Sequence, residues 1–486
     1  MITLKDILYR VSINKVIGNT NVAITNVEFD SRKVSLNDVF VATRGTVSDG
    51  HEYIKNAVNQ GAIAIVCEEL PKDTVNGVTY VKVQNAQQAL AFMASNFYEN
   101  PSENLQLVGV TGTNGKTTIA SLLYQLYTKA GFKVGLLSTV KIMVGNIEHK
   151  ATHTTPDSLT INKYLSKMTD TGCEYCFMEV SSHGIAQHRT TGLKFTGGIF
   201  TNLSHDHLDY HSTFAEYRDV KKKFFDELPS SAFALTNADD KNGMVMLQNT
   251  KAKKRTYALK SIADYKAQIL ENQFSGLLLK LNNNELWSKL IGNFNAYNLL
   301  AIFATTELLG MQTMESLRLI SELESVNGRF QYLIKNKITA IVDYAHTPDA
   351  LKNVLETINA IRTKNEELIT VVGCGGDRDA TKRPKMGHIA SALSTKVIFT
   401  SDNPRTEDPN KIIEAIESGV EPQHFKKTLS IADRKQAIKT ACSFAKENDI
   451  ILIAGKGHET YQEINGERTD FDDFKIVKTL LTQLNN

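Results

Sequence analysis

The 486-residue chain has little cysteine and no long apolar run. Its five cysteines, an odd number scattered along the sequence, argue against a disulfide framework and are typical of a reducing cytoplasm. Cys173 and Cys176 form a C-x-x-C pair, but no second pair completes a zinc site, so we expect buried structural thiols. No apolar stretch approaches the ~20 residues of a membrane span. The N-terminus also lacks the basic and apolar regions of a secretory signal. These absences favour a cytoplasmic protein without membrane insertion.

No charge of one sign dominates. The 55 basic and 53 acidic side chains leave a formal charge of +2, which creates no global field toward nucleic acid or an anionic membrane. Hydrophobic residues make up 42% and charged residues 22% of the chain, as in ordinary globular proteins. At roughly 100–200 residues per domain, the length predicts about three domains.

Short apolar segments alternate with helical patterns along the chain. They lie at residues 105–110, 133–138, 176–180, 197–201, 233–237, 338–343, 368–373, 396–400 and 450–454. This alternation predicts an α/β fold with largely parallel sheets covered by helices. We expect a small N-terminal α/β domain at 1–103, a central P-loop-type parallel-sheet ATPase domain at 104–331, and a C-terminal Rossmann-like α/β domain at 332–486. Polar residues 98–104 would form the first linker.

A glycine-rich turn connects the first of these segments to a helix expected at 116–130. Glycines there let backbone N–H groups approach phosphate at a helix N-terminus. Lys116 can reach the β- and γ-phosphates, and Thr117 can offer its hydroxyl to Mg²⁺. The strict phosphate-loop pattern fails at Val110, which stands where its first glycine belongs, and a plain glycine-rich turn is the alternative. The expected ATP-binding residues are Gly112, Thr113, Asn114, Gly115, Lys116, Thr117 and Thr118.

Two further features indicate metal chemistry. Glu179 follows an apolar strand segment, where a carboxylate beside a phosphate loop is placed to bind Mg²⁺ directly or through water; the alternative is a salt bridge. His207 and His211 are four residues apart, but the glutamate of a zinc protease motif is missing. One histidine therefore remains a candidate ligand of the nucleotide's metal.

Helical spacing gives the three consecutive lysines Lys221, Lys222 and Lys223 different neighbours. Lys222 and Lys223 have acidic residues four positions away, so we expect both to be exposed. Lys221 instead shares its helix face with aromatic side chains, which disfavour its charged form. It either reacts with CO₂ to form a carbamate or extends its ammonium to solvent. Spacing alone does not decide between the two.

In combination these motifs resemble the Mur ligases, ATP-dependent amino-acid-adding enzymes of peptidoglycan synthesis. The resemblance covers nearly the whole chain and is carried by residues 111–117, 179–183, 202–211, 295–301 and 343–349. Within the family, the chain looks like the members that add the third residue of the stem peptide. The residues that indicate this are Asp30, Ser31, Arg32, Thr154, Thr155, Ser181, Gln187 and Arg189.

The resemblance implies site residues. Ser31 and residues 46–48 would bind the UDP end of UDP-MurNAc-L-Ala-D-Glu. Its muramoyl-dipeptide would be bound by Thr154, Thr155, Ser181, Gln187 and Arg189. Lys221 matches the family's carbamylated lysine (N6-carboxylysine), so the catalytic residues would be Lys116, Glu179, His207 and Lys221. Mg²⁺ would be organised by Thr117, Glu179, His207 and the carbamate. Further ATP contacts would come from Asn298, Arg329 and Asp343.

Three loops of the last domain, at 375–378, 402–405 and 455–459, follow predicted strands, where open α/β sheets bind ligands. meso-Diaminopimelate differs from lysine by a second carboxylate, which calls for a guanidinium. Arg378 and Arg405 supply two, unless Arg405 is only a salt-bridged loop residue, and Asp402 and Glu459 suit ammonium groups. The motif at 402–405 resembles that of diaminopimelate-adding members. The implied amino-acid site contains Arg378, Asp402, Asn403, Pro404, Arg405, Gly455 and Glu459.

We therefore expect a monomeric ligase that uses ATP, Mg²⁺, UDP-MurNAc-L-Ala-D-Glu and meso-diaminopimelate, passes through an acyl phosphate, and has no nucleic-acid partner. Three alternatives stay open. One is a lysine-adding member of the same family. Another is folylpolyglutamate synthetase, which the long N-terminal domain disfavours. The third is a catalytically silent NTP-binding scaffold.

Overall fold

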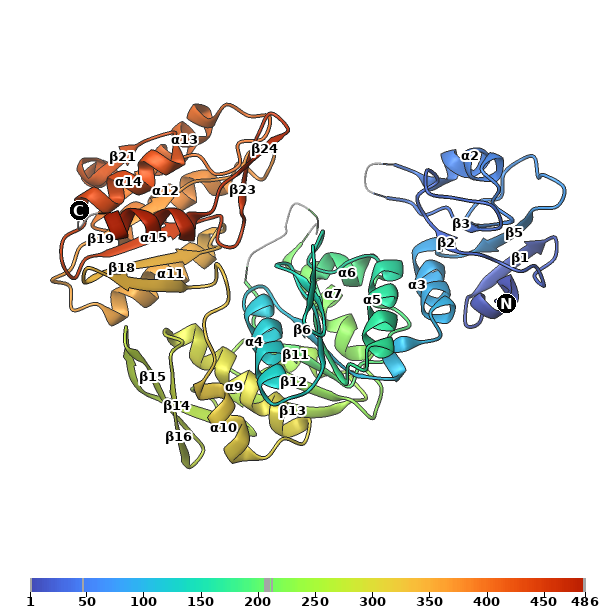
Figure 1. The fold of residues 1–486 in the computed structure, drawn as a ribbon, viewed down its shortest axis with the longest axis horizontal. Coiled ribbons are helices and arrows are strands. Elements are labelled where there is room, and N and C mark those ends of the chain that lie inside the picture. Colours follow the sequence, from blue (N-terminus) through green and yellow to red (C-terminus); the bar gives the residue numbers. More distant parts are fainter. Residues whose placement is uncertain (1, 46–47, 205–209, 211–212, 484–486) are drawn as a thin grey trace. The chain divides into compact units, whose positions relative to one another are not determined.

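The computed structural model describes residues 2–45, 48–204, 210 and 213–483 (Figure 1). The chain divides into two compact units. The first comprises Met1–Asn202 and Ala215–Tyr257, and the second comprises Leu203–Phe214 and Ala258–Asn486. Within the described ranges, no helix is both long enough and apolar enough to cross a membrane.

The first unit begins with a five-stranded sheet. Its elements are α1 (Leu4–Ile7), β1 (Ile13–Ile17), β2 (Val27–Glu28), β3 (Val39–Val41), η1 (Gly50–Tyr53), α2 (Ile54–Asn59), β4 (Ala64–Cys67), β5 (Thr79–Val83) and α3 (Ala86–Phe97). The strand order is β1-β5-β4-β3-β2, parallel except that β1 runs antiparallel to β5. Helices α1 and α3 contribute to the apolar core on one face and α2 to the core on the other. Strands covered on both faces are apolar throughout, which explains the continuous burial of β3 and β4.

A second sheet completes the first unit. Its elements are η2 (Pro101–Glu103), β6 (Gln106–Thr111), α4 (Lys116–Lys129), β7 (Val134–Leu137), β8 (Ile142–Val144), β9 (Ile147–His149), α5 (Ser158–Asp170), β10 (Tyr175–Glu179), α6 (Ser182–Ala186), β11 (Gly197–Phe200), α7 (Phe214–Asp226), β12 (Phe233–Asn237), α8 (Gly243–Met246) and β13 (Lys253–Ala258). The order is β13-β12-β11-β6-β10-β7-β8-β9. Strand β6 is parallel to both β10 and β11. In this register, Glu179 at the end of β10 pairs with Val110 of β6. The turn after β6 and the carboxylate after β10 therefore share one sheet edge.

Among the described residues, the second unit contains a run of three antiparallel strands, a six-stranded sheet with helices on both faces, and a two-stranded sheet. Its elements are β14 (Tyr265–Gln273), β15 (Gly276–Leu281), β16 (Asn284–Ser288), α9 (Asn293–Leu308), α10 (Thr313–Ser321), β17 (Gln331–Lys335), β18 (Ile338–Asp343), α11 (Pro348–Ile361), β19 (Leu368–Val372), α12 (Lys382–Leu393), β20 (Lys396–Phe399), α13 (Pro409–Glu417), η3 (Pro422–Lys427), β21 (Thr428–Ser430), α14 (Arg434–Phe444), β22 (Ile450–Ala454), β23 (Tyr461–Ile464), β24 (Glu467–Asp470) and α15 (Asp473–Gln483). The large sheet has the order β17-β18-β22-β19-β20-β21 and is parallel except for β17. Helices α11, α12 and α13 contribute to the core on one face, and α14 and α15 to the core on the other.

The expected α/β fold class is confirmed. The strands predicted at 233–237, 338–343 and 450–454 coincide with β12, β18 and β22. The expected linker contains the short η2 turn, in which Ser102 is buried. All five cysteines are buried free thiols, as predicted.

Candidate active site

The predicted phosphate loop lies between β6 and α4. Gly112 has a φ of +145°, and a Cβ on it would lie 1.9 Å from Thr201 Oγ1, so a side chain at this position collides with its neighbour. Gly115, with a φ of +90°, immediately precedes α4. The loop thus leads into the N-terminus of a 14-residue helix, where the helix dipole favours phosphate.

Two lysines converge on this loop. Lys116 Nζ donates hydrogen bonds to the carbonyl oxygens of Gly112 at 2.8 Å and of Thr113 at 2.7 Å. Lys221 Nζ, from helix α7, donates to the same Gly112 oxygen at 3.1 Å. Two lysine side chains therefore meet where a triphosphate is expected.

Lys221 lies inside the protein. It is 1% exposed, and its Nζ lies 4.8 Å from the centroid of the Tyr217 ring. Tyr217, Phe224 and Phe225 are buried on the same helix, which confirms the predicted apolar face. The alternative in which this ammonium extends to solvent is wrong, because the side chain points inward to Gly112.

The expectation for Lys222 is also wrong. Lys222 is buried, and its Nζ contacts both carboxylate oxygens of Asp226 at 2.8 and 2.7 Å. The acidic neighbour at i+4 therefore neutralises a buried lysine rather than marking an exposed face. Lys223, whose side chain is 44% exposed, pairs with Glu227 as the pattern indicated.

Glu179 is fully buried at the end of β10. Its Oε2 accepts a hydrogen bond from Thr117 Oγ1 at 2.9 Å, and its Oε1 accepts one from the backbone N–H of Thr139 at 2.7 Å. The partners are a hydroxyl and an amide rather than the cation that a salt bridge requires. Thr117 and Glu179 thus place two oxygen donors side by side at the loop, the donor type that Mg²⁺ prefers. His207, His211 and residues 46–47 lie outside the described residues.

Five residues expected at the muramoyl-dipeptide gather beside Glu179. Thr155 Oγ1 donates to the Glu179 carbonyl at 2.8 Å and accepts from the Ser181 N–H at 2.9 Å. Arg189 donates through Nη1 to the Thr155 carbonyl at 2.5 Å and through Nε and Nη2 to Gln187 Oε1 at 3.0 and 2.6 Å. Thr154 Oγ1 accepts from Thr139 Oγ1 at 3.1 Å, which connects it to the partner of Glu179.

Ser31 belongs to the other sheet of the first unit. It follows β2 and is buried, with its Oγ 3.5 Å from Asn56 Nδ2. The neighbouring residues Asp30 and Arg32 form a largely exposed ion pair of 2.8 Å, which lowers the pKa of Asp30 to about 2. Ser31 thus lies on a different sheet from the five residues expected at the muramoyl-dipeptide.

Three expected ATP contacts lie in the second unit. Asp343 ends β18, accepts a hydrogen bond from the Phe330 N–H at 2.6 Å, and has its pKa raised to about 6 by burial. Arg329 lies over the Tyr344 ring at 4.5 Å and opposes that pKa shift. Asn298 is buried on α9, where its Nδ2 donates to Asn295 Oδ1 at 3.1 Å. Arg329 and Asp343 are therefore neighbours, whereas Asn298 comes from a different element.

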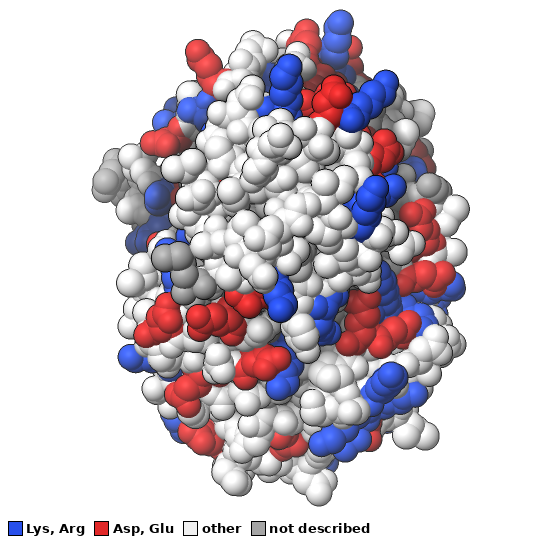
Figure 2. Space-filling model, turned by 90° about the vertical axis from the view of Figure 1, so that its right-hand side faces the viewer, with Lys and Arg blue, Asp and Glu red and all other residues white. Residues whose placement is uncertain are grey.

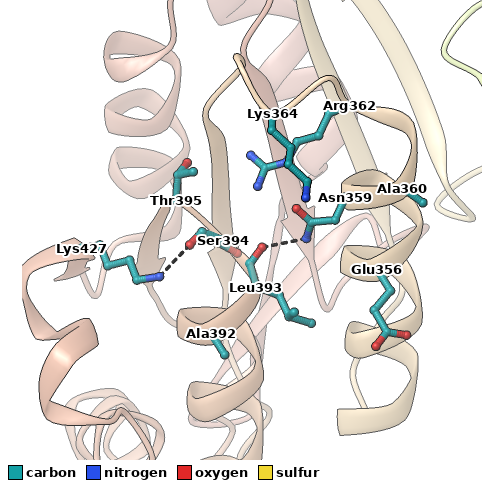
Figure 3. A pocket seen from close by; sticks show the side chains of 10 residues that line it. All are labelled: Glu356, Asn359, Ala360, Arg362, Lys364, Ala392, Leu393, Ser394, Thr395 and Lys427. Atoms are coloured by element: carbon teal, nitrogen blue, oxygen red, sulfur yellow. Dashed lines mark hydrogen bonds between the residues drawn. The ribbon is translucent and has the colours of Figure 1, made fainter.

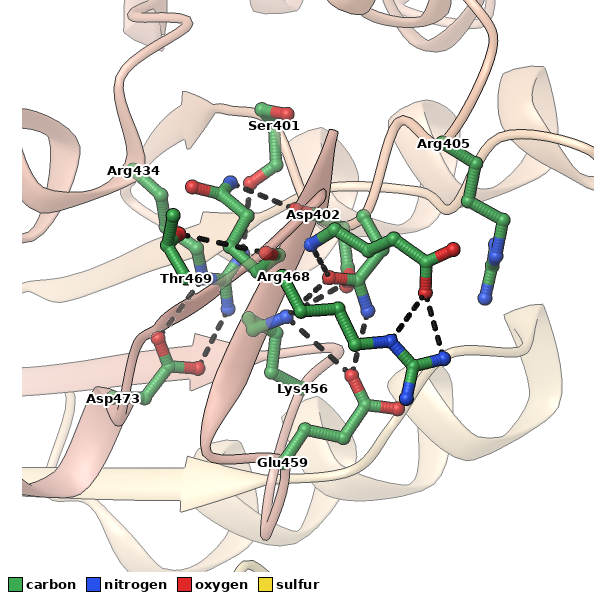
Figure 4. Close-up of polar contacts among 12 residues, drawn as sticks. Ser401, Asp402, Arg405, Arg434, Lys456, Glu459, Arg468, Thr469 and Asp473 are labelled. Carbon is green, nitrogen blue, oxygen red and sulfur yellow. Dashed lines mark hydrogen bonds and ion pairs between the residues drawn. The ribbon is translucent and has the colours of Figure 1, made fainter. Parts of the chain in front are cut away.

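The loops that carry the expected amino-acid residues follow β19, β20 and β22, three adjacent strands. Figure 4 shows Asp402, Arg405 and Glu459 of this set. Asn403 Nδ2 donates to Glu459 Oε2 at 2.7 Å. Gly455 has a φ of +116°, and a Cβ there would lie 2.6 Å from Asp402 Oδ2. Burial, followed by the Asp402 charge, raises the pKa of Glu459. The two acids and the glycine therefore form one compact site.

The two expected arginines both approach Gly375, in the loop that follows β19. Arg405 has a φ of +52°, and its Nη1 donates to the Gly376 carbonyl at 2.6 Å. Its side chain makes no ion pair in the described part of the chain, contrary to the salt-bridged alternative. A Cβ on Gly375 would lie 3.0 Å from Arg405 Nη1 and 3.9 Å from Arg378 Cγ. Gly375 thus lies between the two arginines, and Arg378 is exposed.

Sequence reasoning missed two buried cations of this region. Lys456 lies in the loop at 455–459, is fully buried, and contacts Asp402, Asn403 and Glu459. Arg434 on α14 is also buried and pairs with Asp473 on α15 (Figure 4). The glycines on both sides of Lys456 could have signalled a close approach of this loop to its neighbours. No local pattern could have paired Arg434 with Asp473.

Two other surface features are a hollow lined by basic residues and one face with mixed charges. A hollow lined by Arg362, Lys364 and Lys427 lies between α11 and α12, before β19 and β20 begin (Figure 3). Lys427 Nζ donates to the Ser394 carbonyl at 3.1 Å, so this cation is engaged with a helix end. On the face drawn in Figure 2, acidic and basic side chains are interspersed.

A phosphate loop with a carboxylate beside it, together with a charged site at the edge of a second α/β sheet, defines a multidomain ATP-dependent ligase. The Mur ligase middle domain matches residues 110–306, the Mur ligase glutamate ligase domain matches 328–457, and the Mur ligase family catalytic domain matches 23–98.

Relatives with a known name match this chain over almost its full length. The UDP-N-acetylmuramoyl-L-alanyl-D-glutamate–2,6-diaminopimelate ligase of Cytophaga hutchinsonii is 53% identical, with 99% of each chain covered. The ligase of the same name from Bacteroides fragilis is 52% identical, again with 99% of each chain covered. A solved structure of a ligase of this name is 31% identical, with a TM-score of 0.72 and coverage of 100% of this chain and 99% of the other. The chain belongs to the Mur ligase family.

Proposed function

We propose that this chain joins meso-diaminopimelate to UDP-MurNAc-L-Ala-D-Glu at the expense of ATP, as a step of peptidoglycan precursor synthesis. The single observation that carries the choice of amino acid is the compact site at 402–405 and 455–459. It contains two acids for ammonium groups, and two arginines that approach Gly375 supply guanidinium groups for a second carboxylate. The names of the relatives support the same choice.

The proposed reaction has two steps. The γ-carboxylate of the D-Glu residue attacks the γ-phosphorus of ATP, the bond from that phosphorus to the bridging oxygen breaks, and ADP leaves. The amine of diaminopimelate then attacks the acyl phosphate, phosphate leaves, and the nitrogen loses a proton to give the amide. Lys116 at the phosphate loop would neutralise charge on the transferred phosphoryl group.

The donor set at Glu179 fits Mg²⁺. Thr117 and Glu179 would hold the ion beside the phosphates, with His207 and a carbamate on Lys221 as further expected ligands. Bound Mg²⁺ supplies charge neutralisation for phosphoryl transfer. The N–H of Thr139 holds the second oxygen of Glu179 and thereby orients the carboxylate toward Thr117.

The carbamate would form by attack of the neutral Lys221 amine on CO₂, with a new N–C bond and release of a proton. Burial supports this step, because a side chain that is 1% exposed has lost most of the hydration that favours its ammonium form. The hydrogen bond from Lys221 Nζ to the Gly112 carbonyl supports a position beside the expected phosphates.

We assign binding of the UDP-substrate to residues 1–103, of ATP to 104–331 and of the amino acid to 332–486. Because the three substrates would be bound by separate domains, closure must bring them together. The enzyme would act as a cytoplasmic monomer without nucleic acid or membrane insertion. Scarce cysteine and balanced charge support this setting.

The test is phosphate release from ATP in the presence of UDP-MurNAc-L-Ala-D-Glu with meso-diaminopimelate, with L-lysine or with no amino acid. We expect turnover with diaminopimelate only. Preference for lysine would overturn the role of the arginines, and an ATP-binding protein without turnover would favour the scaffold alternative. The Arg405→Leu variant should raise the KM for diaminopimelate by about 10–100-fold, since a hydrogen bond to a charged group contributes ~1.5–3 kcal/mol. Arg318→Leu, which removes an exposed arginine on α10, is the matched control.

A further inference from the structure

Lys456 stands out because a lysine rarely has no exposed surface. It lies between Gly455, with a φ of +116°, and Gly457, with a φ of +52°. These two conformations turn the chain so that the lysine side chain enters the protein at the end of β22. Tyr461 covers it, with Nζ 5.5 Å from the ring centroid.

The ammonium of Lys456 contacts Asp402 and Glu459, the two residues called the acid pair below, and it also contacts Asn403. Its Nζ lies 2.8 Å from Asn403 Oδ1, 3.4 Å from Glu459 Oε2 and 3.7 Å from Asp402 Oδ1. Asn403 Oδ1 also accepts the backbone N–H of Glu463 at 3.0 Å. With its oxygen held by two donors, the Asn403 amide is oriented so that Nδ2 faces Glu459.

Each acid directs one oxygen toward Lys456. Within the described residues, Asp402 Oδ2 and Glu459 Oε1 accept no hydrogen bond. Counted as formal charges, the lysine cation balances one of the two acids and leaves −1 on the three side chains. That balance suits an incoming ammonium group, since two buried carboxylates without a cation would share a proton.

We propose that Lys456 is a positioning residue of the amino-acid site, which holds Asp402 and Glu459 in place, through Asn403 and directly, so that their other oxygens receive the ammonium of the incoming amino acid. This inference rests on the proposed function, because it assigns Lys456 to the same amino-acid site.

The test compares Lys456→Met with the wild type in steady-state phosphate release. The KM for the amino acid should rise at least tenfold, whereas the KM values for ATP and for the UDP-substrate should stay within twofold. Lys396→Met is the matched control, because Lys396 begins β20, at the opposite end from Asp402, and pairs with Glu367 at 2.5 Å. An unchanged amino-acid KM, or three KM values that rise together, would overturn the proposal.

A pH profile separates positioning from general damage. Burial raises the pKa of Glu459 and the Lys456 charge opposes that shift. Without this cation Glu459 keeps its proton to higher pH, so the ratio of variant to wild-type KM should increase as the pH falls from 8.5 to 6.5. The other charged or titratable groups that face Glu459 are Asp402, Tyr344, Tyr461 and Arg434. A ratio independent of pH would contradict the proposal.

Two further measurements cover a variant that does not fold and a wild type that does not use diaminopimelate. If the methionine variant fails to fold, Lys456→Arg replaces it, because arginine retains the cation. The ratio of the Lys456→Arg KM to the wild-type KM for the amino acid should then not change with pH. A ratio that increases at low pH would refute the proposal. Should the wild type prefer lysine, the diaminopimelate assignment fails and the KM comparison is made with lysine. For a wild type without turnover, calorimetric titration with meso-diaminopimelate replaces KM, and equal affinity of wild type and variant would overturn the role of Lys456.

Discussion

The buried pair Arg434–Asp473 allows a quantitative test of how the amino-acid site is supported. Both side chains have no exposed surface. Arg434 donates through Nε and Nη2 to the two carboxylate oxygens of Asp473 at 2.9 and 2.8 Å. It also donates to the carbonyls of Ala454 at 3.0 Å and Ser401 at 3.5 Å. These carbonyls immediately precede Gly455 and Asp402, so one guanidinium ties both loops of the site.

Arg434→Met would leave the Asp473 carboxylate buried without its cation. Breaking a buried ion pair in this way costs about 3–5 kcal/mol of unfolding free energy. The double variant Arg434→Met/Asp473→Leu leaves no charge behind and replaces both side chains with apolar ones. We expect it to cost at least about 2 kcal/mol less than the sum of Arg434→Met and Asp473→Leu measured separately.

Urea unfolding followed by tryptophan fluorescence measures these energies. The chain has a single tryptophan, Trp287 on β16, in the same compact unit as the pair. Lys352→Met, which removes an exposed lysine paired with Glu356 at 3.7 Å, is the control and should stay within about 0.5 kcal/mol of the wild type. Single variants that cost less than about 1 kcal/mol, or costs that add in the double variant, would refute the reasoning.

Other predictions concern the ATP site and its surroundings. Lys221→Ala should abolish turnover and recover part of it with added short carboxylates; full activity without them would contradict the carbamate. Gly112→Ala should raise the KM for ATP at least tenfold because its Cβ would collide with a threonine hydroxyl, whereas Gly131→Ala, in open space after α4, should leave that KM unchanged. Burial raises the pKa of Asp343 from 3.8 to about 6, so this carboxyl group opposes folding increasingly as the pH rises from about 4 to about 6, and by a constant amount above that range. Asp343→Asn should therefore stabilise the protein more at pH 8 than at pH 5, by about 1–2 kcal/mol in urea titrations, and equal effects would refute that sign.

Elements of the fold and site that depend on local sequence patterns could be predicted. Apolar runs located the central strands, because a strand buried on both faces needs continuous apolar side chains. Helical spacing identified the inward face of Lys221, and the glycine-rich turn located the phosphate loop. The hairpins β8–β9, β14–β16 and β23–β24 were not predicted, since their strands are short or carry exposed side chains. Lys222 was misjudged because an acidic residue at i+4 is equally consistent with an exposed pair and with a buried one.

Partners that meet only in the folded chain could not be predicted. Arg434 and Asp473 are separated by 39 residues, and Lys456 meets Asn403 across 53 residues. No local pattern marks Arg434 as buried, and the glycines beside Lys456 indicate a close approach but do not identify its partner. The three loops could be placed at one edge because parallel strands end together, but the side chains that hold their acids in place depend on helix and strand packing.

The proposed binding role explains the burial of these cations better than their contribution to stability does. A buried ion pair loses hydration that its Coulomb attraction barely recovers, and apolar side chains of similar volume are often as stabilising. Around Asp402 and Glu459 the fold nevertheless holds Lys456 and Arg434 fully buried, each with several hydrogen bonds or ion pairs. Polar networks of this kind specify one arrangement when their members are satisfied. A pair of carboxylates kept in place for an ammonium group requires such an arrangement, which an apolar replacement could not provide.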